Sequence, residues 1–396
     1  MGVGRLWKDQ VFRYKDNHSG RWVTKLTDYK GHSNHLYFTN PCWLNNNTSF
    51  IFTSDRENAS NLFRYDLPAN TITQLTDLEG EERPEGYYSA VNNAHYFWYG
   101  KVLYELPLAT LELRPVYEAG DDFVPRNTLS VTADGKYVCT LLQLADDVKP
   151  TGDAAIGFAY SRFVELFERK PMSRVVRIGI ATGKLEVMHE DRHHMGHVNA
   201  SPVLPNVLTF CHEGPWIRVD QRIWGLDIET GKVWKIRLQD EHLAIGHEYW
   251  LADGVTIGYH GRQRADQGRQ FYGYTKWDNT ERFEFDFPFH CTHFASNDRD
   301  LFVGDGTAHF PHPVYGRYAK PFIMLFKREG DRFVGPRILA YHRSTFNNQH
   351  AHPHPRFTPD GKYVMYSSDL TGYANIYLVE VGDFHDLPVL STNDAP

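Results

Sequence analysis

Internal repetition constrains the fold of this chain more than any other feature of its sequence. The segment 132–138 reads TADGKYV, and segment 358–364 reads TPDGKYV. Short apolar runs joined by Thr-Gly-Lys occur around 182–184 and again around 230–232. Glycine turns between alternating apolar runs are typical of β-hairpins, because glycine supplies the positive φ of the turn. Each unit therefore predicts a short antiparallel meander.

The spacing of these units predicts the architecture. Units that return about every 50 to 60 residues indicate a β-propeller. For a chain of 396 residues we expect an all-β, seven-bladed β-propeller of four-stranded antiparallel blades, with six and eight blades as alternatives. The final strands, within 363–381, should pair with amino-terminal strands, because an open propeller would leave sheet edges unpaired.

One segment departs from the β pattern. Residues 156–170 carry apolar side chains at three- and four-residue spacing, which predicts an amphipathic helix inserted in a blade loop. A packing element at the rim is the simplest interpretation of such a helix. We expect the whole chain, 1–396, to form one domain around this insertion.

Composition limits the kinds of molecule that this chain is expected to bind. The net charge is −7 and no basic run stands out, which argues against a nucleic-acid-binding protein. No apolar stretch approaches the length of a membrane span. The four cysteines are far apart and form no CxxC pair, as expected for reduced thiols. We therefore expect a cytoplasmic protein whose partner is a small molecule, and the oligomeric state is not predicted.

A histidine-rich segment predicts a metal site. His352 and His354 are two residues apart in a run that the intervening prolines keep out of a helix, so an extended backbone would place both imidazoles on one face. Gln349 can add an amide oxygen. His293 occupies the same position before a hairpin in another blade, and equivalent positions should converge on the central channel. These four residues predict a site for a divalent cation.

Further polar residues occupy related positions. His247 and His197 each precede a hairpin copy in earlier blades, and His247 is either a further ligand or a base beside the metal. The polar segment 211–215 includes His212, and both His212 and His197 are candidate substrate-binding residues. Arg222 precedes an apolar strand, and its planar fork suits a carboxylate.

The chemistry of the predicted metal site favours an anionic substrate. Its ligands are all neutral, so a bound divalent ion would keep its full charge. Imidazole ligands favour zinc, iron or nickel, whereas an amide oxygen with open positions also admits manganese. The chain has no GxSxG, Walker or GxGxxG motif in the required context, so acyl transfer and nucleotide binding lack support.

Four motifs resemble those of the oligogalacturonate lyases, a family of seven-bladed propellers: FCHEGP at 210–215, HEYW at 247–250, CTH at 291–293, and Gln349 with HPHP at 352–355. The similarity runs from about residue 26 to residue 381. It implies that the positions matching His293, Gln349, His352 and His354 bind manganese.

The same resemblance implies an activity. His247 would act as the Brønsted base, and Arg222 would assist at the substrate carboxylate. The reaction would be β-elimination of short oligogalacturonides in pectin catabolism, which gives unsaturated uronate products.

Two alternatives remain from the sequence. One is a lyase for another uronic-acid oligosaccharide, because the proton and carboxylate chemistry is shared. The other is a non-catalytic propeller similar to the TolB-type repeats, acting as a platform for protein binding. The hairpin repeats suit that alternative equally well, but the histidine-rich segment is not explained by it.

Overall fold

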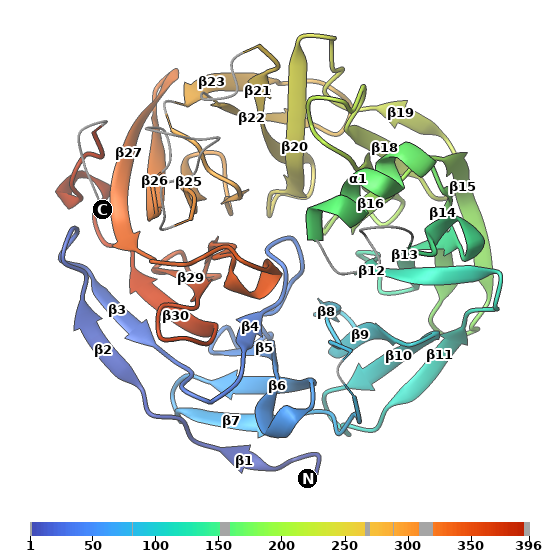
Figure 1. Ribbon diagram of the computed structural model, residues 1–396, viewed down its shortest axis with the longest axis horizontal. Coiled ribbons are helices and arrows are strands. Elements are labelled where there is room, and N and C mark those ends of the chain that lie inside the picture. The colour runs from blue at the N-terminus through green and yellow to red at the C-terminus, as the bar shows by residue number, and fades with distance from the viewer. Residues whose placement is uncertain are drawn as a thin grey trace. The chain divides into compact units, whose positions relative to one another are not determined.

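The computed structural model of the chain describes residues 2–80, 82–150, 159–265, 270–287, 289–308 and 320–391. Their strands form seven antiparallel sheets (Figure 1). One five-stranded sheet has the order β1 (Leu6–Trp7), β7 (Thr71–Gln74), β6 (Asn61–Asp66), β5 (Ser49–Ser54), β4 (Ser33–His35). The other has the order β2 (Phe12–Lys15), β3 (Trp22–Lys25), β30 (Asn375–Glu380), β29 (Tyr363–Ser368), β28 (Arg356–Phe357).

Five sheets have four strands each. Two of them are β11 (Arg114–Glu118), β10 (Val102–Pro107), β9 (Ala94–Tyr99), β8 (Tyr87–Ser89), and β12 (Phe123–Val131), β13 (Tyr137–Leu144), β14 (Met172–Gly179), β15 (Leu185–Arg192). Two more are β16 (Met195–Ala200), β17 (Val207–His212), β18 (Ile223–Asp227), β19 (Val233–Lys235), and β20 (Leu243–Trp250), β21 (Thr256–Gln263), β22 (Gln270–Lys276), β23 (Phe283–Phe287). The last is β24 (Phe294–Ala295), β25 (Leu301–Gly304), β26 (Phe322–Glu329), β27 (Arg332–Tyr341).

The fold class is an all-β, seven-bladed β-propeller, as the repeats predicted. Two sheets differ from the expected four strands because amino-terminal strands add to them. The contacts divide the chain into two compact units: a first unit of Met1–Pro84, Asp266–Tyr274 and Phe283–Pro396, and a second unit of Glu85–Ala265 and Thr275–Arg282. The expected single domain stays a prediction.

The repeated DGK segments form the same turn. Gly135 and Gly361 have φ of 72° and 69°, in the left-handed region that glycine adopts without a steric penalty. In both turns the threonine hydroxyl donates a hydrogen bond to the aspartate two residues later, over 2.7 Å. The sequence repeat is therefore a repeat of turn chemistry.

The predicted pairing of the chain's two ends is confirmed. In the second five-stranded sheet, β3 pairs with β30, and Val23 lies opposite Val379. Both valine side chains are fully buried. The amino-terminal strands thus cover an edge of β30 that would otherwise be free to pair with other chains.

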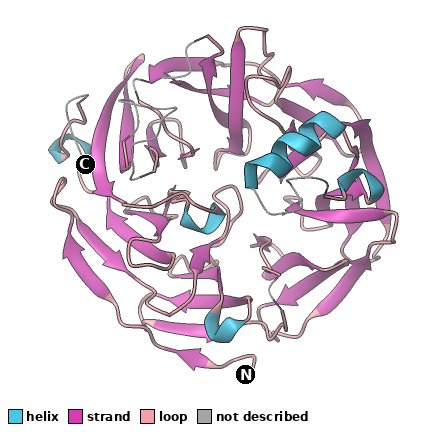
Figure 2. Ribbon diagram, in the orientation of Figure 1, coloured by secondary structure: helices cyan, strands magenta, loops and turns pink. Residues whose placement is uncertain are grey.

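Helical structure is minor (Figure 2). The helix α1 (Ala159–Arg169) lies within the segment where a helix was expected, and residues 156–158 are outside the described part. Its Phe167 packs so closely on Gly214 that a Cβ there would lie 2.2 Å from the ring. Short 3-10 helices are η1 (Arg56–Asn58), η2 (Asp146–Val148), η5 (Gln349–Ala351) and η6 (Phe384–Asp386).

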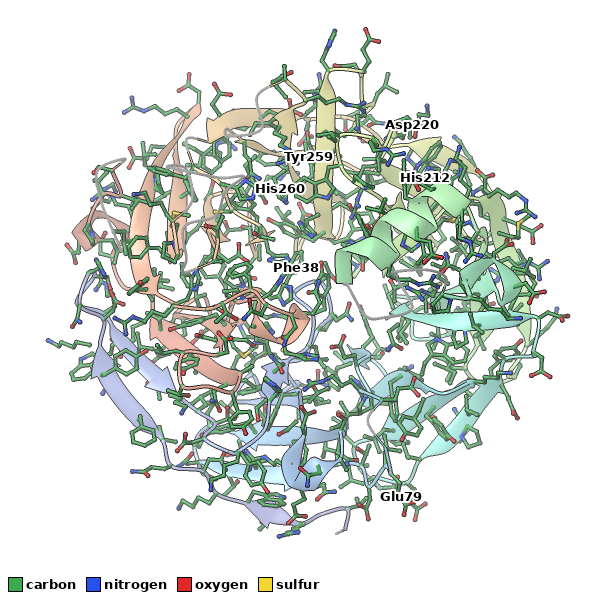
Figure 3. All side chains as sticks on the ribbon, in the orientation of Figure 1. Phe38, Glu79, His212, Asp220, Tyr259 and His260 are labelled. Carbon is green, nitrogen blue, oxygen red and sulfur yellow. The ribbon has the colours of Figure 1, made fainter. Side chains whose placement is uncertain are left out.

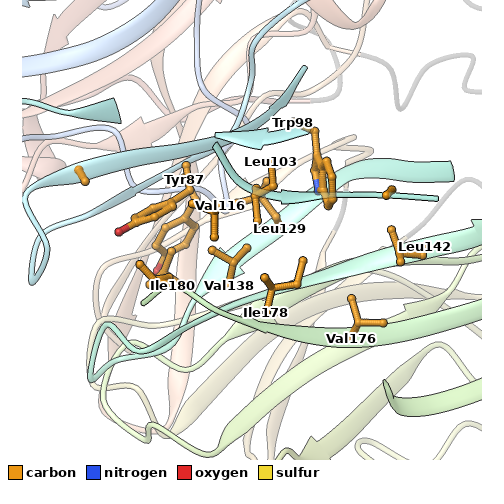
Figure 4. Packing of buried hydrophobic residues seen from close by; sticks show 14 residues of the cluster. Tyr87, Trp98, Leu103, Val116, Leu129, Val138, Leu142, Val176, Ile178 and Ile180 are labelled. Carbon is orange, nitrogen blue, oxygen red and sulfur yellow. The ribbon is translucent and has the colours of Figure 1, made fainter. Parts of the chain in front are cut away.

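The core consists of apolar side chains between sheets. Figure 4 shows one such cluster in the second unit, where Trp98 and Leu103 of one sheet meet Val138 and Ile178 of the next. Among the described helices, none is long and apolar enough to cross a membrane.

Val23→Ala should lower the free energy of unfolding by about 2 kcal/mol, because it removes buried methyl groups at the β3–β30 pairing. Val91→Ala is the matched control, since Val91 is 66% exposed. Urea unfolding of the two variants beside the parent chain checks this. Equal stability of both variants would contradict the role given to the pairing.

Candidate active site

Three of the predicted metal ligands are brought together in the first unit. His293, His352 and His354 form a three-histidine cluster in which one ring nitrogen from each lies within 4.8 Å of the others. All three are buried, with exposures of 2%, 5% and 7%. The ring planes of the three pairs meet at 43° to 67°, so their in-plane lone pairs can converge on one point.

The protonation and bonding of these histidines fit a metal ion. Nδ1 of His352 and Nε2 of His354 are buried without a hydrogen-bond partner in the described structure. Burial, and then the charge of His293, lower the pKa of His352 to about 3, and the same causes hold the pKa of His354 well below its usual value. Neutral imidazoles with unused lone pairs are the form that binds divalent transition metals.

A buried carboxylate orients His293. Oδ2 of Asp305 lies 2.6 Å from Nδ1 of His293, and Oδ1 accepts a hydrogen bond from the His293 backbone N–H over 2.8 Å. This contact fixes Nε2 of His293 as the ligand atom, in an arrangement that recurs around metal-binding histidines. No motif in the sequence marked Asp305 as a partner of His293. The pairing of β24 with β25 accounts for this contact. Phe294 pairs with Gly304, and the next pair outward is His293 with Asp305.

The backbone of the His352–His354 segment differs from the expected extended run. His352 is extended, but His354 has φ of 44°, in the left-handed region that costs a non-glycine residue energy. The carbonyl of Pro353 between them accepts a hydrogen bond from the Ser367 backbone N–H over 2.9 Å and faces Nε2 of His35 at 3.2 Å. These contacts hold the two imidazoles in place.

Aromatic rings surround the cluster. Tyr37 meets the His354 ring edge to face at 4.9 Å, and Phe38, labelled in Figure 3, lies 5.6 Å from the His293 ring. Gln349 begins η5, and its backbone carbonyl accepts from the His352 N–H at 3.3 Å. Gln349 is exposed, and its predicted role as a ligand stays a prediction.

Arg222 lies in the second unit, in a cluster with Glu213 and Glu248 that we call the arginine–glutamate cluster. Nη1 and Nη2 of Arg222 each contact one oxygen of Glu213 at 3.1 Å, and Nε contacts Glu248 at 3.0 Å. Arg222 is 1% exposed. Burial alone would raise the pKa of Glu213, but Arg222 and then His197 outweigh it and lower that pKa to about 2.

His197 joins this cluster. Its Nε2 lies 3.3 Å from Glu213 and its Nδ1 lies 3.1 Å from Glu248, so each ring nitrogen faces a carboxylate. The ring lies beside the two carboxylates that contact Arg222.

The predicted equivalence of His197 and His247 has a structural cause. Each lies in a β-bulge of the first strand of its sheet, β16 and β20, where the pairing register shifts. Their φ values are 49° and 44°. A bulge interrupts the alternation of side chains along a strand. Nδ1 of His247 lies 3.1 Å from Nε2 of His260 on β21.

His212 is packed against another histidine. Its ring is stacked on that of His193 at 3.9 Å with 11° between the planes, and it is 5% exposed. Burial, and then the charge of His193, lower its pKa to about 3. With Asp191 these histidines bring ligand atoms close together, but the lone pairs of parallel rings do not converge. A metal ion does not fit this arrangement.

A third group of possible ligands is also unsuited to a metal. His197, Cys211 and Glu213 lie close together, but both Glu213 oxygens already contact Arg222. Burial raises the pKa of the Cys211 thiol well above its usual value, which disfavours the thiolate that binds metals. In the described structure, the three-histidine cluster is therefore the group of possible ligands that fits a divalent ion.

Comparison with known proteins agrees with this geometry. The family model for oligogalacturonate lyase matches residues 1–384. The chain belongs to the oligogalacturonate lyase family. Curated relatives of the family include the oligogalacturonide lyase of Pectobacterium atrosepticum, 29% identical over 93% of this chain and 96% of that protein. The oligogalacturonate lyase of Dickeya dadantii is 28% identical over 97% of this chain and 99% of that protein.

Solved structures of the oligogalacturonate lyase family are also similar. An oligogalacturonate lyase in complex with manganese has 25% identity and a TM-score of 0.86, covering 97% of this chain and 99% of that one. The oligogalacturonate lyase of Vibrio parahaemolyticus has 25% identity and a TM-score of 0.85, covering 96% and 99%.

Asp305→Asn should weaken manganese binding about 10- to 100-fold, because the partner that orients His293 loses its charge. Asp298→Asn is the control, since Asp298 is exposed and its carboxylate accepts hydrogen bonds from backbone N–H groups of its own turn. Calorimetric titration with manganese measures the affinity of both variants. Unchanged affinity in Asp305→Asn would contradict the orienting role.

His212 should make stability depend on pH. Its folded pKa of about 3 lies below the ordinary histidine value of 6.5, so between these values the unfolded chain binds a proton that the folded chain does not. The free energy of unfolding therefore falls as the pH falls, by at most about 1.4 kcal/mol per pH unit. Between pH 7 and pH 5, metal-free His212→Phe should lose about 1–2 kcal/mol less than the parent chain. Exposed His242→Phe should lose as much as the parent.

Proposed function

We propose that this chain is a manganese-dependent lyase that cleaves short oligogalacturonides by β-elimination. The observation that carries the proposal is the buried three-histidine cluster, in which one ring nitrogen from each histidine lies within 4.8 Å of the others. Membership of the oligogalacturonate lyase family supports the substrate, and a manganese-bound family structure supports the metal. The free, buried cysteines agree with a reducing compartment, and we place the enzyme in the cytoplasm.

The reaction explains why cations are needed. Elimination removes the C5 proton of a uronate, next to a carboxylate that is already anionic and resists further charge. Manganese, held by His293, Gln349, His352 and His354, would supply positive charge that stabilises this carboxylate as the proton leaves. Because the protein ligands are neutral, they leave that charge undiminished.

The proton goes to a histidine in this proposal. His247 takes the C5 proton, the C–H electron pair becomes the C4–C5 double bond, and the C4–O4 bond breaks. The leaving oxygen takes a proton from water, and His247 returns its proton to solvent. The products are an unsaturated uronate and a shortened chain.

Arg222, His197 and His212 have supporting roles in the proposal. Arg222 assists at the substrate carboxylate, and to do so it must exchange one of the carboxylate contacts that now occupy its three nitrogens. His197, half-buried beside it, is a substrate-binding residue. His212 is almost fully buried and neutral, so any contact with substrate would be as a neutral ring.

The direct experiment is incubation of the manganese-loaded protein with digalacturonate, following the absorbance of the new double bond. We expect product with digalacturonate and none after removal of manganese by a chelator. Signal with a different uronide but not with digalacturonate would change the substrate assignment. No signal with any uronide would remove the proposed activity.

Two variants separate the base from the metal site. His247→Ala should reduce kcat by about 10²- to 10⁴-fold with full manganese content, because it removes only the proton acceptor. His352→Ala should lose both manganese and activity. Metal analysis beside the elimination assay checks both variants, with His242→Ala as an exposed control. Normal turnover in His247→Ala would remove it as the base.

A further inference from the structure

His247 contacts a second histidine, His260. His260 lies on β21 and is fully buried (Figure 3). It is paired across the strands with Gly246, the residue before His247. Because the bulge in β20 follows at once, His247 is turned so that its Nδ1 lies 3.1 Å from Nε2 of His260. We call these two residues the histidine dyad.

The two rings meet edge to edge. Their planes differ by 12°, and their centroids are 5.3 Å apart. That separation exceeds the 3.1 Å between the nitrogens by about the sum of the two ring radii. The nitrogens therefore face each other in a shared plane, which is the geometry of a straight hydrogen bond rather than of stacked rings.

Trp216 packs against both rings of the histidine dyad. Its ring is nearly perpendicular to both histidines, at 84° and 5.2 Å to His247 and at 82° and 5.0 Å to His260. The indole also packs against the backbone of Gly246, where a Cβ would lie 2.4 Å from it. Any side chain at position 246 would displace Trp216, so the glycine is part of the support.

On the basis of the proposed function, we propose that His260 is a positioning residue that accepts a hydrogen bond from Nδ1–H of His247. One nitrogen of a neutral imidazole carries the proton and the other is the base. With Nδ1 protonated, Nε2 of His247 carries the lone pair that takes the C5 proton. In the other tautomer Nε2 would already be protonated and could take no proton.

A neutral partner suits an anionic substrate. When His247 gains the C5 proton, its Nδ1–H becomes a stronger donor, and His260 stabilises the imidazolium without adding a negative charge. A carboxylate in that place would repel a uronate. The nearby carboxylates Glu213 and Glu248 are instead paired with Arg222 and His197.

The test compares two substitutions of His260 in the manganese-loaded enzyme. Leucine cannot accept a hydrogen bond, whereas the glutamine carbonyl can reach a similar position. In His260→Leu we expect kcat to fall about tenfold or more, with KM and manganese content unchanged. The acid limb of the kcat/KM profile should move to lower pH, because the imidazolium has lost its acceptor. His260→Gln should recover most of the parent kcat and most of the parent position of the acid limb.

His95→Leu is the matched control, because His95 is also a fully buried histidine on a strand of the second unit. It should change stability but neither kcat nor the pH profile. In the parent chain, ¹H–¹⁵N spectra of labelled histidines should show the His247 ring protonated at Nδ1. The signals are assigned by their loss in His247→Ala.

The outcomes separate this inference from the proposed function. An active His247→Ala would remove His247 as the base, whatever His260 does. An inactive His247→Ala, together with a His260→Leu enzyme whose kcat and acid limb match the parent, would overturn the dyad alone. If His260→Leu fails to fold, a His247 ring protonated at Nε2 in the parent chain would overturn it.

Discussion

The pairing of β3 with β30 is the interaction on which the candidate metal site depends. β30 continues through β29 to β28, and the segment that holds His352 and His354 leads directly into β28. The carbonyl between the two histidines accepts its hydrogen bond from Ser367 on β29. An amino-terminal strand thus supports a carboxyl-terminal site, and the two ends of the sequence become one structural element.

Charge is arranged differently in the two units. In the first unit the cluster consists of imidazoles, burial holds the pKa values of His352 and His354 low, and Asp305 contacts Nδ1 of His293. In the second unit the carboxylates are buried and paired with a guanidinium. Breaking one of these buried pairs by removing a partner costs about 3–5 kcal/mol, because the other charge is left without compensation.

The sequence predicted the features that depend on local chemistry. DGK turns, the pairing of the chain's ends and the convergence of His293 with His352 and His354 all follow from repeat position, and all are present. The features that the sequence did not predict depend on strand register and on contacts between residues far apart in the chain. The bulges at His197 and His247 cannot be read from alternation, because they break it. The contact of His260 with His247 and the burial of Arg222 between two glutamates follow from those bulges and from packing.

His197 and His247 in the second unit, and His354 in the first, have a backbone conformation that favours glycine. Each costs the folded chain of the order of 1 kcal/mol or more. Glycine at these positions would relieve that cost and remove the imidazole. Under the proposed function, selection for thermostability alone would favour substitutions that remove these imidazoles, so engineering for heat resistance has to exempt the three positions. Function, as proposed, and stability would then compete for the same residues.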